Sequence, residues 1–249
     1  MKHIYAFEEI RDYENYHDII QRFSKRLNDY QLILEKEYFL LDKPKGIVWT
    51  SVEAATTIFS DLPIPAFTNK DTIYISPDLT GWRKLFIRQL EGKDLPSIQR
   101  FYEQLSENHI LTILGHELTH HSDLFLDEFE DEREDSIWFE EGMCEYLPRK
   151  LLLTDKEFDE ISAIEKELVG VFTGEYGNRS IDEFGSNSYT ASLSSIMFDY
   201  WRSFLSVKYL VEDCFQNNVN LVFEEYHKWD KEGRKLSLTE HFGLNKISI

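Results

Sequence analysis

The sequence predicts an α+β fold in which a small mixed sheet with an edge strand at a cleft packs on a mainly helical C-terminal half. Strand-like segments occur only in the first third of the chain, and the pattern is helical from about residue 82 onward. Strands gathered before helices are typical of this class. No repeat or low-complexity linker marks a boundary, so we expect one domain over 1–249. Its expected parts are an N-terminal helical extension at 1–45, a sheet with the first motif helix at 46–122, and a helical subdomain at 123–249.

The early elements follow from local patterns. Apolar residues recur at three- and four-residue steps from 13 to 40 and predict a helix. Residues 46–50 form an apolar run that predicts a short buried strand, and Ser51 is the expected N-cap of a following helix. After a proline-containing loop, residues 71–76 alternate as an exposed or edge strand would.

Charge and composition disfavour several functional classes. The chain has 27 basic and 46 acidic residues, a net charge of −19 with histidine neutral. Nucleic acids and anionic membranes need clustered cations, so we expect neither as a partner. The two cysteines, Cys144 and Cys214, are too few for a disulfide framework. Acids appear by position 8, and no apolar run approaches the roughly 18 residues of a spanning helix, so a cytoplasmic protein is expected.

An acidic segment stands apart at 127–135, where seven of nine residues are acidic. Such a run is typical of a solvated loop or a frayed helix end. It is also compatible with an acidic rim that attracts a cationic substrate. Both interpretations stay open from the sequence.

The residues that indicate chemistry begin with His116-Glu117-Leu118-Thr119-His120. Four residues make slightly more than one helical turn, so the two imidazoles project from one face and can share a cation. Glu117 can then reach a water on that cation without binding the cation itself. This is the zinc-hydrolase arrangement. The adjacent His121 points about 100° away from His120 and is expected to pack or to lie at the surface.

A second motif follows at 138–142, Trp-Phe-Glu-Glu-Gly. With both motifs in place the chain resembles the gluzincins, the zinc peptidases of the MA clan that include the thermolysin-like and aminopeptidase N-like families. The resemblance implies that Glu141, 21 positions after His120, is the third zinc ligand. Glu140, at 20 positions, is the rival by counting, although Trp and Gly frame Glu141. It also implies that Glu145, one turn later, accepts a hydrogen bond from a ligand histidine.

The resemblance covers about residues 46–225 and implies a zincin-like fold. In minimal members of this clan, the strand before the metal helix lies at the sheet edge and pairs with an extended substrate. That strand corresponds here to Thr72, Ile73, Tyr74 and Ile75. In this clan a tyrosine at the start of a late helix donates a hydrogen bond from its hydroxyl to the oxyanion. Tyr200 is the candidate for this role, and Tyr189 is the reserve.

The implied activity is zinc-dependent hydrolysis of peptide bonds in a peptide or protein substrate. Zn²⁺ would be held by His116, His120 and Glu141, with Glu117 as general base. The Gly-x-Met-Glu-Asn loop of aminopeptidases is absent from the sequence, which favours cleavage within a chain. Alternatives are a catalytically silent zinc-bound scaffold that binds a protein partner, a hydrolase of a non-peptide amide, and a protease with a single host target.

Overall fold

The structure is a computed structural model that describes residues 1–127, 129 and 135–246. It confirms the α+β class, and the chain divides into two compact units. The first unit holds Met1–Asp123 and Leu147–Thr154, and the second holds Leu124–Tyr146 and Asp155–Ile249. Most of the acidic segment at 127–135 lies outside the described residues. No helix in the described part of the chain is long and apolar enough to cross a bilayer.

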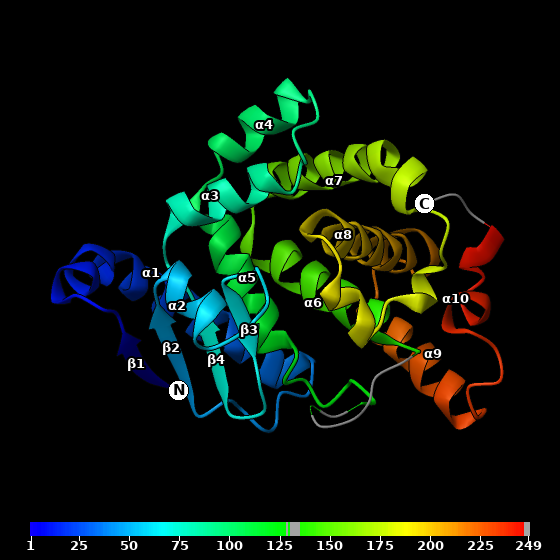
Figure 1. Ribbon diagram of the computed structural model, residues 1–249. Coiled ribbons are helices and arrows are strands. Elements are labelled where there is room, and N and C mark those ends of the chain that lie inside the picture. The colour runs from blue at the N-terminus through cyan, green and yellow to red at the C-terminus, as the bar shows by residue number, and fades with distance from the viewer. Residues whose placement is uncertain (128, 130–134, 247–249) are drawn as a thin grey trace. The chain divides into compact units, whose positions relative to one another are not determined.

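The first unit contains a four-stranded sheet of order β1-β2-β4-β3 (Figure 1). Its strands are β1 (Lys2–Ala6), β2 (Gly46–Thr50), β3 (Ala66–Thr68) and β4 (Thr72–Ile75). β1, β2 and β4 are parallel, and β3 runs antiparallel to β4. The expected N-terminal helical extension at 1–45 therefore contains a strand of the sheet as well as the helix α1 (Ile10–Glu37). Nearly all side chains of β1 are exposed, so no apolar pattern marked the strand.

The expectation that residues 72–75 form a sheet edge is wrong. β4 pairs with β2 on one side and with β3 on the other, so its backbone groups are used within the sheet. A substrate strand has no free edge to join at Thr72, Ile73, Tyr74 or Ile75. The edge on this side is β3, which has only three residues and follows directly after Pro65. A strand this short gives too little alternation for a sequence pattern to reveal.

Five complete helices belong to the same unit as this sheet. They are α1 (Ile10–Glu37), α2 (Val52–Thr57), α3 (Leu79–Arg88), α4 (Pro96–Glu103) and α5 (Glu107–Thr119). The side chain of Ser51 caps α2 by accepting from the Ala54 amide at 3.1 Å, as predicted. α5 packs against α1, β3 and β4. The hydroxyl of Tyr30 on α1 is 2.7 Å from that of Thr119, which joins the two helices at the end of α5.

The second unit is helical. Its elements are most of α6 (Ile137–Leu152), α7 (Asp155–Tyr176), η1 (Ile181–Glu183), η2 (Ser186–Thr190), α8 (Leu193–Tyr209), the π-helical turn η3 (Leu210–Cys214), α9 (Val219–Lys231), α10 (Leu238–His241) and η4 (Leu244–Lys246). α8 begins at Leu193, where Ser192 caps it through the Ser195 amide. Tyr200 is therefore in mid-helix, and the expectation that it opens a helix is wrong, because the serine cap sets the start one turn and more upstream.

Candidate metal centre

Two histidines face each other on α5. The ε nitrogens of His116 and His120 are 3.0 Å apart, and their rings are inclined by 72°. Two imidazoles on one tetrahedral zinc, each at about 2.05 Å, have nitrogens about 3.3 Å apart. His116 is buried and His120 is half-buried. The helical spacing therefore brings both nitrogens to a separation close to that of two ligands on one ion.

The glycine at position 115 allows α5, the helix that carries both histidines, to pack closely against Pro148. A Cβ at Gly115 would lie 2.7 Å from the Cβ of Pro148, closer than packed carbon atoms approach. Glu117 lies next to His116 on the same helix, with 7% of its surface exposed. A carboxylate so placed is shielded from bulk solvent and adjacent to a candidate ligand.

His121 packs against the sheet, which is one of the two positions that the sequence left open. Its ε nitrogen is 2.8 Å from the hydroxyl of Thr68 on β3, and the residue is buried. Burial, with a smaller effect from His120, lowers the pKa of His121 to about 4. The ring is therefore neutral near neutral pH and ties the end of α5 to the edge strand.

A third potential ligand comes from α6. Within the described residues, His116, His120 and Glu141 form a group whose ligand atoms all lie within 4.8 Å of one another. Glu140, the rival by counting, is buried but is not a member of this group. Two imidazoles and one carboxylate are the donor set of many catalytic zinc sites, so the residues present fit that metal.

Glu141 has a tyrosine partner within the second unit. The hydroxyl of Tyr189 donates to Oε1 of Glu141 at 2.8 Å, and it lies 3.3 Å from the hydroxyl of Tyr200. Burial, reinforced by the Glu141 carboxylate, raises the pKa of Tyr189 well above its ordinary value, so this phenol keeps its proton. The primary and reserve tyrosine candidates thus lie together. Glu145 is half-buried one turn after Glu141, and its bond to a histidine stays a prediction.

The tryptophan and glycine that frame Glu141 are both fixed by packing. The indole N–H of Trp138 donates to Oδ1 of Asp182 at 3.1 Å. A Cβ at Gly142 would lie 2.4 Å from the carbonyl oxygen of Ser203 on α8. Only glycine allows this approach of α6 to α8. The residues on either side of Glu141 in the Trp-Phe-Glu-Glu-Gly motif therefore each have a packing role.

The start of α6 is held by Ser136. Its carbonyl accepts from the amides of Phe139 and Glu140 at 3.0 and 3.2 Å, as the residue before a helix does. Its hydroxyl donates to Oδ2 of Asp127 at 2.7 Å. The first turn of α6 is therefore attached to Asp127, the first residue of the acidic segment.

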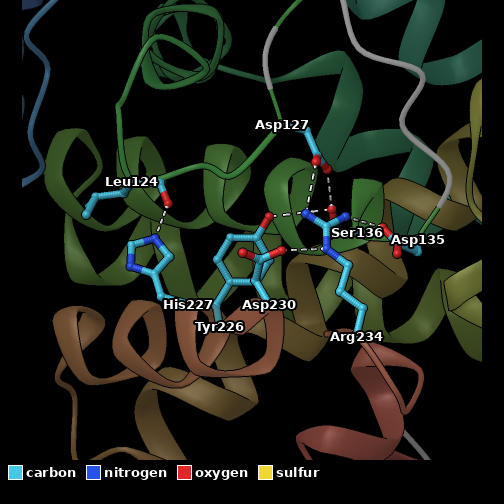
Figure 2. Close-up of polar contacts among 8 residues, drawn as sticks. All are labelled: Leu124, Asp127, Asp135, Ser136, Tyr226, His227, Asp230 and Arg234. Atoms are coloured by element: carbon cyan, nitrogen blue, oxygen red, sulfur yellow. Dashed lines mark hydrogen bonds and ion pairs between the residues drawn. The ribbon is translucent and has the colours of Figure 1, made fainter. Parts of the chain in front are cut away.

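An arginine from beyond α9 completes this attachment, and sequence reasoning missed it. Figure 2 shows the Arg234 guanidinium among three carboxylates: Nε donates to Asp230 at 2.8 Å, Nη1 to Asp135 at 2.9 Å and Nη2 to Asp127 at 3.2 Å. The guanidinium carbon lies 4.9 Å from the centre of the Trp229 ring. Arg234 adopts a left-handed φ of 49°, which costs a non-glycine residue about 1 kcal/mol or more. No motif marks an arginine that lies about a hundred residues from two of its partners, Asp127 and Asp135.

The ladder between β3 and β4 determines which backbone groups of β3 point outward. Asn69 and Thr72 exchange both backbone bonds, at 3.1 and 3.3 Å, and the Asn69 side chain accepts from the amides of Asp71 and Thr72. Hydrogen-bonded and non-hydrogen-bonded residue pairs alternate along an antiparallel ladder. The backbone N–H and C=O groups of Phe67 therefore point toward β4, whereas those of Ala66 and Thr68 point outward. Ala66 is 5% exposed and Thr68 is half-buried.

Comparisons with known proteins add no relative. No family model matches the chain, and neither the curated proteins nor the solved structures contain a match.

Proposed function

We propose that this protein is a zinc metallopeptidase that cleaves within peptide chains. The observation that carries the proposal is the pair of histidine ε nitrogens 3.0 Å apart, with a carboxylate of Glu141 in the same group of potential ligands. The His₂Glu set leaves a fourth position for water in zinc sites of this type. Zinc is proposed because this donor set suits it better than calcium or magnesium, which prefer oxygen ligands alone.

A bound zinc supplies a water of lowered pKa and an electrophile for the substrate carbonyl. Glu117 follows His116 directly on α5, and in this proposal it accepts the proton of the attacking water and returns it to the leaving amine. Tyr200 donates its hydroxyl to the oxygen that gains negative charge. Both roles use side chains that are already held in helices, which keeps the cost of orienting them low.

The substrate backbone is proposed to add to β3. The outward N–H and C=O groups of Ala66 and Thr68 can pair with an extended peptide without reading its sequence. The contact of His121 with Thr68 links this edge to the end of the helix that carries the two histidines. This replaces the strand at 72–75, whose backbone is already paired.

Two measurements on the purified protein test the proposal. Isothermal titration with Zn²⁺ after chelator treatment should give one site per chain, and a digest of a broad peptide library should show internal cleavage that a chelator abolishes. A chain that takes up no zinc contradicts the proposed site. One that binds zinc but leaves the library intact favours the alternative, a silent zinc-bound scaffold that binds a protein partner.

A further inference from the structure

The two tyrosines beside Glu141 form a hydrogen-bonded chain with a defined direction. A phenol has one proton to donate, and the hydroxyl of Tyr189 gives its proton to Oε1 of Glu141. An ionised carboxylate has none to offer in return. The 3.3 Å contact between the two hydroxyls is therefore donated by Tyr200 to Tyr189. The order of donation is Tyr200 to Tyr189 to Glu141.

One buried ring supports both phenols. Phe184 is 1% exposed and lies with its ring centre 5.7 Å from that of Tyr189 and 5.5 Å from that of Tyr200. Tyr189 comes from η2 and Tyr200 from α8, so Phe184 fixes the separation of hydroxyls from two different elements. Aromatic contacts of this kind hold ring orientation more firmly than area alone would.

We propose that Tyr189 is a positioning residue that selects which oxygen of Glu141 binds the metal, an inference that rests on the proposed function. By holding Oε1, the Tyr189 hydroxyl turns Oε2 toward the ion and keeps the carboxylate a one-oxygen ligand. A one-oxygen ligand preserves the open fourth position that a water needs. Hydrogen bonds to metal ligands commonly set ligand orientation and affinity in this way.

The two tyrosines then have separate tasks. Tyr189 has its only proton committed to Glu141, so it cannot donate to a substrate while Glu141 is a ligand. Tyr200 can turn its proton from Tyr189 to a substrate oxygen without disturbing Glu141. The structure therefore assigns Tyr189 to the ligand and leaves Tyr200 as the oxyanion donor.

Matched Tyr→Phe variants test this assignment by zinc affinity, measured by competition with a chromophoric chelator, independently of turnover. Tyr189→Phe keeps the ring on Phe184 and should raise the zinc dissociation constant about 10- to 100-fold. Tyr200→Phe should change it less than twofold. The Co²⁺-substituted Tyr189→Phe protein should show altered d–d absorption, because the carboxylate is free to bind through both oxygens.

A double variant makes the test specific to Glu141. Glu141→Gln alone should abolish tight zinc binding, and adding Tyr189→Phe should weaken the residual binding by less than twofold. Far-UV circular dichroism of the metal-free variants checks that they fold; if Tyr189→Phe does not, Phe184→Leu provides the second variant and should weaken zinc binding severalfold.

Three results overturn the inference. They are wild-type zinc affinity and cobalt absorption in Tyr189→Phe, an equal loss of affinity in Tyr200→Phe, and a further loss in the double variant as large as that of Tyr189→Phe alone. Failure of the unaltered protein to bind zinc is a different outcome and contradicts the proposed function itself.

Discussion

The ε nitrogens of His116 and His120 lie 3.0 Å apart on one face of α5. One neutral imidazole can donate to the other across that gap, whereas a bound cation would accept a lone pair from each. Replacing His120 by alanine should therefore abolish zinc uptake, as measured by elemental analysis after gel filtration. Unchanged zinc content would contradict the assignment of both histidines.

Glu117→Gln should keep the metal and lose turnover. The amide is nearly the same size as the carboxylate but cannot accept a proton from water, and loss of a general base typically costs about 10²- to 10⁴-fold in rate. Zinc content and kcat on a cleaved library peptide give the two readings. A variant that cleaves as fast as the unaltered protein would exclude Glu117 from the reaction.

Gly142→Ala should destabilise the fold. The new Cβ would lie 2.4 Å from the Ser203 carbonyl oxygen and 2.7 Å from Cγ2 of Val207, so α6 and α8 must separate. Such overpacking costs about 1–3 kcal/mol in the free energy of unfolding, measured by urea denaturation. Gly170→Ala in α7 is the control. A Cβ there has nothing within 4 Å, so it should stabilise by about 0.5–1 kcal/mol. Equal effects at both sites would refute the packing argument.

Asp199→Asn should remove part of the pH dependence of stability. Asp199 is fully buried, and burial raises its pKa from 3.8 to about 6 despite the opposing charges of Arg179 and Arg202. Between these values the folded protein keeps a proton that the unfolded chain has released. Stability conferred by the protonated carboxyl is therefore present at low pH and is lost as the pH rises through about 6.

The loss of unfolding free energy is at most about 3 kcal/mol, because the pKa of Asp199 differs by roughly two units between the folded and unfolded protein. Urea unfolding at intervals from pH 4 to 7.5 should show the unaltered protein losing stability relative to Asp199→Asn across that window. Arg179 pairs with Asp199 in the unaltered protein, and an asparagine oxygen can still accept a hydrogen bond from that guanidinium. Parallel curves for the two proteins would show that Asp199 does not titrate there.

Arg234→Gln should weaken the attachment of α6. The change leaves Asp127, Asp135 and Asp230 close together without their shared cation, at an expected cost of about 1–3 kcal/mol in unfolding free energy. Arg22→Gln breaks an exposed pair with Glu107 and should cost about 1 kcal/mol or less. Thermal unfolding in low salt compares the two. If Arg22→Gln lowered the unfolding temperature more than Arg234→Gln does, the three carboxylate contacts of Arg234 would not be a main contribution to stability.

Ala66→Pro should impair binding of an extended substrate. Proline removes an N–H that points away from β4, so the ladder within the sheet is kept while an outward donor is lost. KM for a cleaved peptide should rise severalfold at unchanged zinc affinity, with circular dichroism as the check on folding. An unaltered KM would exclude pairing at β3.

Local signals predicted much of what surrounds the histidines. The strand at 46–50, the Ser51 cap and the helix carrying His116 and His120 each depend on neighbours within a few residues, and the structure has all three. The apolar spacing from 13 to 40 likewise predicted α1, which spans Ile10–Glu37. Such elements are determined by short-range hydrogen bonds and side-chain periodicity, which the sequence displays directly.

What the sequence did not reveal depends on long-range pairing. β1 joins the sheet through partners more than 40 residues away, and the three residues of β3 become an edge only because β4 lies between them and β2. Arg234 meets Asp127 and Asp135 across about a hundred residues. No periodicity encodes these contacts, because they arise from the packing of the complete chain.

The turn after β3 has a consequence for which backbone groups a visiting strand would meet. The Asn69 side chain fixes the hairpin by accepting two amides, and side chains alternate along a strand with a period of two. A slip by one residue would point Phe67's amide outward and turn those of Ala66 and Thr68 inward. A single carboxamide thus sets which backbone groups of β3 face outward, and with them the register that the proposed substrate strand would have to adopt.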